Sequence, residues 1–237
     1  MDGVATGLLL ATLAGLSIPL GAALAMLPGF RPNWLDTRLR HTVTAFGGGA
    51  LFSAIAFVLI PQAAARLPAF PLLAAFLIGG LVFFAVDHLL ARHGGKGTML
   101  LAMLLDFIPE AMALGALIAG QPDVALLTAA IIALQNLPEG FSAYRELAAK
   151  GTVARRRLLL VFVLLVPIGP AAAAIGLFVL NDQPAILGLC MAFAAGGILY
   201  LLFEDVAPAA QQKNAAAPAL GAVAGFALGL AGHLAIT

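Results

Sequence analysis

The stretch LLDFIPEAMALGAL, residues 104–117, decides how the rest of the chain is interpreted. Its apolar residues run continuously instead of alternating, which is typical of a buried or lipid-facing helix and not of a barrel strand. Yet it contains two carboxylates, Asp106 and Glu110, with Pro109 between them. A charge near the centre of a bilayer costs on the order of 3 kcal/mol, so acids in such a segment usually mark a functional path.

The whole chain has the apolar character of this stretch. Of its 237 residues, 62% are hydrophobic and only 10% are charged, whereas soluble domains carry about a quarter charged residues. Such a chain cannot cover a water-facing surface with polar groups, and we expect an integral membrane protein. The net charge of +1 gives no reason to expect nucleic acid as a partner. The single cysteine, Cys190, excludes an intramolecular disulfide and a cysteine-rich metal cluster.

Eight apolar stretches are long enough to cross the hydrocarbon, which takes roughly 20 residues. We expect them at about 4–27, 41–65, 71–91, 98–119, 124–147, 157–180, 185–209 and 215–236. Turn-forming Gly, Pro, Asn and Asp fill the breaks between them, as in PGFRPN at 28–33. The predicted fold is therefore an all-α bundle of eight transmembrane helices that forms a single domain, residues 1–237. Because the spans leave little room for a soluble catalytic domain, we expect no enzyme.

The basic residues lie almost entirely in alternate loops. Eleven of the twelve Lys and Arg lie in the odd-numbered loops, and only Arg66 lies in an even-numbered one. By the positive-inside rule, the odd-numbered loops are cytoplasmic. We therefore expect a protein of the cell (inner) membrane, surrounded by membrane lipid, with both termini extracytoplasmic.

Six of the eleven acidic residues fall within the expected spans, not counting Glu146 at the very end of 124–147: Asp87, Asp106, Glu110, Glu139, Glu204 and Asp205. Asp106 and Glu110 are four residues apart, so both project from one face of a helix. Gln135 and Glu139 repeat that spacing in the next span. Three carboxylates brought together would repel one another, and a divalent cation between them removes the repulsion.

A proline precedes the glutamate in both spans, at Pro109 and Pro138. Each proline frees a backbone carbonyl in the preceding turn, which a membrane tolerates only where another group satisfies it. A cation is one such group. Two alternatives stay open: a lone acid such as Asp87 can be protonated or hydrogen-bonded without a transport role, and a chain of acids can relay protons.

On these residues the chain resembles the ZIP (Zrt-/Irt-like) family of divalent metal transporters, in its bacterial form. The likeness also extends to AFGGGALFSAIAFVLIPQA at 45–63, GGLVFFAVDHLL at 79–90 and GGILYLLFEDVAP at 196–208. The resemblance implies a 3+2+3 arrangement, in which spans 4 and 5 are central and carry the metal. Spans 1 to 3 and 6 to 8 would form an inverted repeat around them.

The resemblance implies a metal site made of Asp106, Glu110, Gln135, Asn136 and Glu139. The chain departs from the family at several of the matching positions. Asp106 and Gln135 stand where the family has histidine, Phe107 and Val166 stand at positions of a second site, and Gln62 replaces an acid. The primary site thus keeps its positions but contains no imidazole.

Four further residues are candidates for the cation path. Ser53 could lend a hydroxyl, or as a small residue simply let helices approach each other. Glu204 and Asp205 suit an exit relay toward the cytoplasm, or else cap the helix or face the lipid interface. Asp87 could help to gather metal at the cytoplasmic end.

The expected activity is the movement of a divalent cation toward the cytoplasm. Oxygen ligands suit harder ions such as Mn²⁺ or Mg²⁺, and imidazole suits zinc and copper, although zinc also accepts carboxylates. Zinc, iron, manganese and cadmium all stay candidates. We expect no cofactor apart from the transported cation, and the chain contains no G-x-x-x-x-G-K-[ST] motif, so gradients should drive transport.

Two questions stay open on the sequence. The alternative function is that of a ZIP-derived membrane protein whose degenerate site serves as a metal sensor or partner subunit. The small residues between Gly225 and Gly229 suit either a homodimer contact or packing within the bundle.

Overall fold

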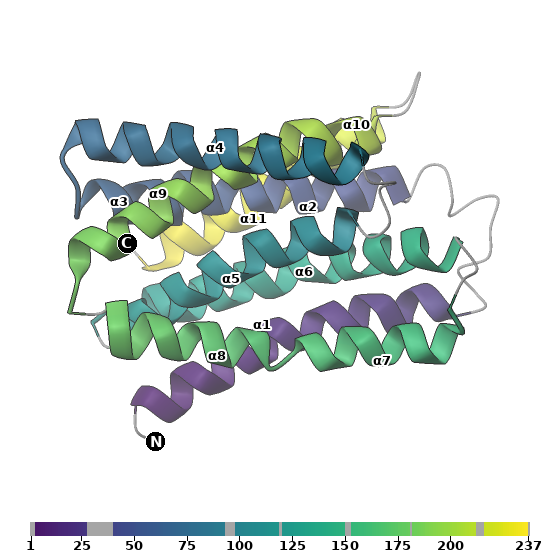
Figure 1. Cartoon of the computed structure of the whole chain (residues 1–237), viewed down its shortest axis with the longest axis horizontal. Coiled ribbons are helices and arrows are strands. Elements are labelled where there is room, and N and C mark those ends of the chain that lie inside the picture. Colours follow the sequence, from purple (N-terminus) through teal and green to yellow (C-terminus); the bar gives the residue numbers. More distant parts are fainter. Residues whose placement is uncertain are drawn as a thin grey trace.

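The computed structural model describes residues 3–27, 40–92, 98–118, 120–149, 153–180, 182–211 and 216–236. Within these ranges every regular element is a helix and there is no strand. The helices run side by side along the long axis of the molecule (Figure 1). The predicted all-α class is therefore confirmed.

Each expected span corresponds to one helix or to a run of consecutive helical segments. In chain order these are α1 (Gly3–Met26), α2 (Arg40–Ala54), η3 (Ile55–Leu59), α3 (Ile60–Ala64), α4 (Ala69–Arg92), α5 (Thr98–Ile118), α6 (Pro122–Ala149), α7 (Arg155–Leu165), α8 (Ile168–Ile175), η4 (Gly176–Leu180), α9 (Pro184–Leu201), η5 (Leu202–Val206), α10 (Ala207–Ala210) and α11 (Ala217–Ile236). The segments named η are single π-helical turns, which often occur at functional sites. The turns η3 and η5 continue the α-helices on either side without a loop, whereas η4 continues α8 and is followed by a connection to α9.

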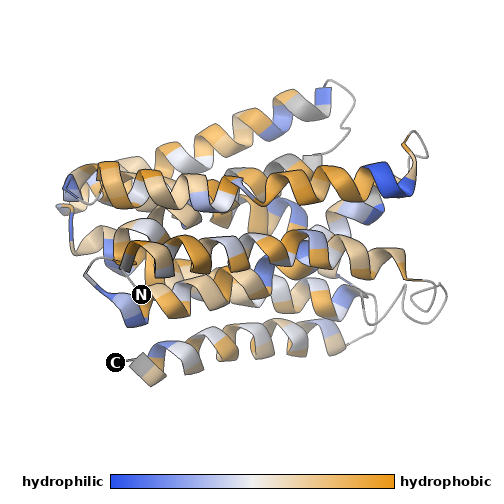
Figure 2. Ribbon diagram, turned by 90° about the horizontal axis from the view of Figure 1, so that it is seen from below, coloured by the Kyte–Doolittle hydropathy of each residue, from blue (hydrophilic) through white to orange (hydrophobic). Residues whose placement is uncertain are grey.

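Among the described residues, seven helical segments are long and apolar enough to cross a membrane, judged by length and composition. They begin at Val4, His41, Ala69, Pro122, Arg155, Pro184 and Ala217. Figure 2 shows hydrophobic residues along most of each helix, with hydrophilic ones mainly toward the ends. The remaining expected span, 98–119, corresponds to α5, in which Phe107–Ile118 is counted as a shorter apolar helix. The eight-span 3+2+3 arrangement stays a prediction.

The buried hydrophobic residues form two clusters. The first is built mainly by α1, α5, α6, α7 and α8. The second is built mainly by α2 to α3, α4 and α9, and α5 adds Ala113 and Ala116 to it. In Figure 1 the two groups of helices lie on opposite sides of the bundle, with α5 and α6 on the side of the first group that faces the second. Side chains of α5 thus reach both clusters.

The helix α1 crosses α6 at very close range. A Cβ added at Gly140 of α6 would lie 2.3 Å from the backbone oxygen of Ile18, and one added at Gly21 of α1 would lie 2.0 Å from that of Leu137. No side chain fits at either position, so glycine lets the two backbones touch. This crossing fixes the part of α6 that carries Glu139.

The small residues of α11 pack within the bundle. A Cβ added at Gly225 would lie 1.9 Å from the backbone oxygen of Phe46, and one at Gly229 would lie 1.9 Å from the Ser53 hydroxyl. Both contacts are with the rod formed by α2 and η3. Of the two uses considered for this stretch, the structure therefore shows packing inside the chain.

Candidate cation site on α5 and α6

The helices α5 and α6 follow each other directly and pack together, with Pro109 and Pro138 inside them. Their connection is so short that the two helices must run antiparallel. The i, i+4 spacing places Glu110 on the same face as Asp106, and Glu139 on the same face as Gln135. The side chain of Asp106 lies outside the described residues, so its predicted role stays a prediction.

Glu110 and Gln135 meet across the interface between α5 and α6. The Gln135 amide nitrogen Nε2 donates a hydrogen bond to Oε2 of Glu110. Gln135 has no exposed surface and Glu110 is 2% exposed, so the bond lies within the protein. Two side chains that the sequence placed on separate helices are therefore in direct contact.

Several polar atoms around this contact are buried without a hydrogen-bond partner. They are Oε1 of Glu110, Oε1 of Gln135, Oδ1 and Nδ2 of Asn136, and Oε2 of Glu139. Leaving one buried polar group unsatisfied costs about 1–3 kcal/mol, and more when it is charged. Four of these five atoms are oxygens, which can donate electron pairs but cannot satisfy one another.

The two carboxylates of the site lie close enough for their charges to interact, as expected for Glu110 and Glu139 on facing helices. Among the described residues, no group of three or more His, Cys, Asp or Glu is placed to hold a metal ion. The described part of the site consists instead of two carboxylates and the amides of Gln135 and Asn136. It can offer carboxylate and amide oxygens as ligands to a cation.

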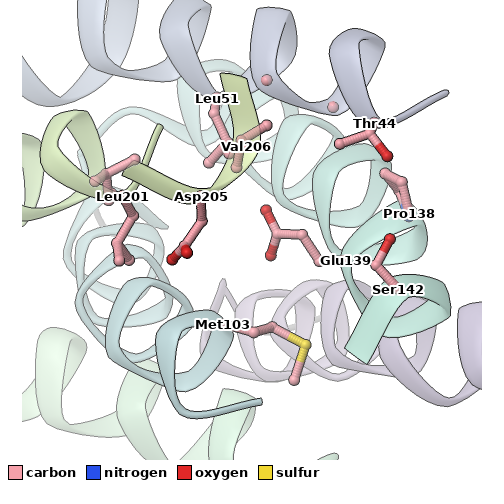
Figure 3. Close-up of a pocket in the computed structure, with 12 residues that line it drawn as sticks. Thr44, Leu51, Met103, Pro138, Glu139, Ser142, Leu201, Asp205 and Val206 are labelled. Atoms are coloured by element: carbon pink, nitrogen blue, oxygen red, sulfur yellow. The ribbon is translucent and has the colours of Figure 1, made fainter. Parts of the chain in front are cut away.

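A cavity of about 70 Å³ lies beside Glu139. Its lining comes from α2, α5, α6, α9 and η5: Thr44, Gly47, Gly48, Leu51, Met103, Pro138, Glu139, Ser142, Ile198, Leu201, Asp205 and Val206. Figure 3 shows the carboxylates of Glu139 and Asp205 pointing into it from opposite walls. A volume of this size has room for about four water molecules, at about 15 Å³ each. We call it the α2–α9 cavity.

A second and much smaller cavity, of about 10 Å³, lies on the other side of the site. Its lining is Ala54, Val58, Leu59, Glu110, Thr128, Ile131 and Ile132. This volume is too small for more than about one water molecule, and only Glu110 and Thr128 among its lining residues are polar. The protein thus leaves a larger space beside Glu139 and almost no space beside Glu110.

Phe107 and Val166, which the sequence resemblance places at a second metal site, are both buried hydrophobic residues. Phe107 has no exposed surface and belongs to the first cluster. A Cβ added at Gly169 would lie 2.8 Å from Cζ of the Phe107 ring, and one at Gly15 would lie 3.3 Å from it. The ring therefore fills the space between α5, α1 and α8, and polar ligands are absent from these two positions.

The other four candidates are distributed more widely. Ser53 is buried, donates its hydroxyl to the Ala50 carbonyl at 2.6 Å and lies against α11, and it lines neither cavity. Asp87 accepts a hydrogen bond from the Tyr200 hydroxyl at 3.1 Å, and this bond joins α4 to α9. Glu204 is exposed, whereas Asp205 lines the α2–α9 cavity.

Two hydroxyl residues of the cavity were not among the sequence candidates. Ser142 lies three residues after Glu139 on α6, so helical spacing could have identified it as part of the same face. Thr44 lies on α2, just before the glycines 47–49. No spacing rule connects Thr44 with α6, because the two meet only through tertiary packing.

A group of hydrogen bonds joins α3 to the connection between α5 and α6. Gln62 Nε2 donates to Oε1 of Gln121 at 2.9 Å, and Arg66 donates to both the backbone oxygen and Oε1 of Gln62. Partial burial lowers the pKa of the Arg66 guanidinium, which remains charged because arginine does not lose its proton in proteins. This end of the bundle is opposite the one with the basic loops.

Comparison with known proteins gives one informative match. The chain is 31% identical over 164 residues to a protein of Myxococcus xanthus named "Zinc transporter GufA". The match covers 62% of this chain and 62% of that relative, so the chain spans less than two thirds of the relative's length. No protein-family model matches the chain. Together with the apolar helices, the match identifies the chain as an integral membrane protein.

Proposed function

We propose that this chain is a ZIP-like transporter that carries a divalent metal cation across the membrane through a site on α5 and α6. The ligands in the proposal are Glu110, Gln135, Asn136 and Glu139, with Asp106 as a further candidate. The observation that carries the proposal is the set of buried, unpartnered oxygens of the first four residues. The similarity to a protein named as a zinc transporter supports the same activity.

The physical reason for proposing a cation is the free-energy cost of the site when none is bound. Two carboxylates inside a membrane protein repel each other, and each loses the water that would solvate it. A doubly charged ion reverses the repulsion and satisfies the oxygens of Glu110, Gln135, Asn136 and Glu139 at once. Packing alone gives no reason to bury these unpartnered oxygens on two neighbouring helices.

The two cavities support a path with one open and one closed side. The α2–α9 cavity lies beside Glu139 and toward the end of the bundle with the basic loops, which the positive-inside rule makes cytoplasmic. The space beside Glu110 is nearly filled. Such asymmetry is what alternating access requires of any single conformation, and here it favours release of the ion into the cytoplasm.

Asp205 is the group we propose as the next contact for the ion after Glu139. Both carboxylates line the α2–α9 cavity, and they point into it from opposite walls (Figure 3). Glu204 and Asp205 are consecutive residues of the π-helical turn η5 and point in different directions, so that Asp205 lines the cavity while Glu204 is exposed. An ion that leaves Glu139 therefore meets a second anionic ligand before it reaches water.

Uptake of a divalent cation into proteoliposomes tests the proposal. Replacement of Glu139 by Ala should reduce uptake by more than about tenfold, since even a group that only supports a metal ligand contributes about 10–100-fold. The matched control is Asp123→Ala, because Asp123 is an exposed acid on the same helix. The control should retain the wild-type rate.

Equal uptake by wild type and Glu139→Ala would contradict the assignment of the transport site to Glu139. Calorimetric titration of the purified protein with the cation distinguishes a carrier from a protein that only binds metal. Heat that depends on Glu110 and Glu139 without any uptake would indicate a metal-binding sensor or partner subunit instead of a carrier.

A further inference from the structure

We propose that the site is selective for a hard, oxygen-preferring divalent cation that keeps part of its hydration shell, of which Mn²⁺ is the test ion, in preference to zinc. The inference rests on the proposed function and specifies its cargo. It assigns Gln135 and Asn136 as the residues that determine this specificity. The structural basis is an all-oxygen set of unpartnered acceptors next to one unpartnered amide donor.

The amide of Gln135 is fixed with its oxygen available as a ligand. An ionised carboxylate can only accept hydrogen bonds, so the side of the amide that faces Glu110 must be the NH₂ group. The hydrogen bond from Nε2 to Oε2 of Glu110 has this polarity. It leaves Oε1 of Gln135 and Oε1 of Glu110 as the two remaining acceptors, one from each helix.

Asn136 adds a feature that a bare cation cannot satisfy. Its Oδ1 can bind a metal, but its Nδ2 is a donor and needs an acceptor. Asn136 has no exposed surface, and it shares a helical face with Glu139 three residues later. A water molecule held by the cation can accept the hydrogen bond from Nδ2, so an incompletely dehydrated ion satisfies both atoms of the side chain.

The available space is compatible with a hydrated ion. Four protein oxygens fill four positions of a six-coordinate ion and leave two for water, as is common for Mg²⁺-like cations. The α2–α9 cavity beside Glu139 has room for about four water molecules. Zinc in protein sites is instead usually four-coordinate and bound by histidine or cysteine.

The walls of both cavities contain no histidine and no cysteine among their described lining residues. The histidines whose side chains are described are engaged or placed elsewhere. His41 contacts the Ala209 carbonyl at 2.7 Å, His233 stacks on Phe57 and His88 stacks on Phe84.

The sulfur of Met103 is the one soft donor among the described lining residues of the two cavities. It lies in the wall of the α2–α9 cavity, which Glu139 also lines (Figure 3), whereas Glu110, Gln135 and Asn136 do not line that cavity. Any nitrogen- or oxygen-based site binds zinc more tightly than manganese in general, so selection depends on ligand type and geometry. Amides in place of imidazoles remove the donors that zinc prefers.

The experiment measures initial uptake of Mn²⁺ and Zn²⁺ by proteoliposomes, singly and in competition. Wild type should take up Mn²⁺ faster than Zn²⁺ at equal free concentration. Gln135→His introduces an imidazole into the site and should shift the uptake ratio toward Zn²⁺ by about tenfold or more. Asn136→His is the second variant and should shift the ratio in the same direction. Gln183→His changes an exposed glutamine at the start of α9 and should leave the ratio unchanged.

The outcomes separate the cargo from the transport function. Uptake that depends on Glu139 but favours Zn²⁺ in wild type, with no change in Gln135→His or Asn136→His, would overturn the cargo assignment and leave transport intact. A shift in the ratio caused by Met103→Leu instead would assign specificity to the thioether and also overturn it. Absence of uptake and of binding heat for both ions in wild type would refute the proposed function itself.

Discussion

Phe107 shows how a single residue changes the chemistry of the site. Its ring is fully buried and lies against Gly15 of α1 and Gly169 of α8. The space that polar ligands of a second metal site would need is filled by an aromatic side chain that packs with small residues. The site on α5 and α6 is consequently limited to one group of oxygens.

Replacement of Phe107 by Ala should destabilise the protein. Removing a buried phenylalanine leaves a cavity and costs about 3–5 kcal/mol, which corresponds to a fall in Tm on the order of 10 °C for a chain of this size. A thermal unfolding scan in detergent measures the change. Phe70→Ala is the matched control, because Phe70 is 84% exposed, and its Tm should remain within about 2 °C of wild type. Equal Tm values for both variants would contradict the packing role.

The sequence predicted that the two Pro-Glu motifs come together, but it did not predict which residues of the other helices lie beside them. Helical spacing alone put Gln135 and Glu139 on one face, and the structure brings Gln135 to Glu110. Spacing could not predict that Asp205 faces the cavity while Ser53 packs against α11. Those positions depend on how separate helices pack against each other, and a pattern within one helix cannot predict that packing.

At the scale of elements, the position of α6 depends on its crossing with α1. The backbone of Gly140 lies so close to Ile18 that even a methyl group would overlap the Ile18 carbonyl. Glu139 is the residue next to this contact. Any displacement of α6 from α1 therefore moves a proposed ligand relative to those of α5.

Gly140→Ala should impair both stability and uptake. The new Cβ would lie 2.3 Å from the Ile18 oxygen, so the helices must separate and the geometry of the site must change. We expect a lower Tm and a several-fold lower uptake rate, measured in detergent and in proteoliposomes. Gly120→Ala is the control, since a Cβ there meets nothing within 4 Å. A Gly140→Ala protein with wild-type Tm and uptake would show that the crossing is not a constraint.

The π-helical turns were not predicted, although the spans that contain them were. Each of η3, η4 and η5 lies within one of the expected spans, and a π turn has no composition that distinguishes it from an α-helical one. Their placement follows from packing with neighbouring helices. For η5 the effect on the site is direct, because it contains Asp205.

At the scale of the whole molecule, the orientation of the first and last described helices agrees with the predicted topology. The start of α1 and the end of α11 lie at the same end in Figure 1. This agrees with an even number of crossings, and the positive-inside rule predicts that this end lies outside the cytoplasm. Composition sufficed to predict a helical membrane protein, whereas the grouping into two hydrophobic clusters required the structure.

Cysteine labelling tests this orientation. In a Cys190→Ala background, Val153→Cys lies between α6 and α7, and Asp182→Cys lies between η4 and α9; both positions are exposed. A membrane-impermeant maleimide added outside intact cells should label position 182, and should label position 153 only after permeabilisation. The reverse pattern would invert the topology and with it the proposed direction of release.

The most direct measurement of the central claim is anomalous diffraction from crystals soaked in Mn²⁺. The account predicts one strong peak within coordination distance of the unpartnered oxygens of Glu110, Gln135, Asn136 and Glu139, and its loss in Glu139→Ala crystals. Mn²⁺ bound elsewhere on the protein, with no density among these four side chains, would contradict the claim that a cation passes between α5 and α6.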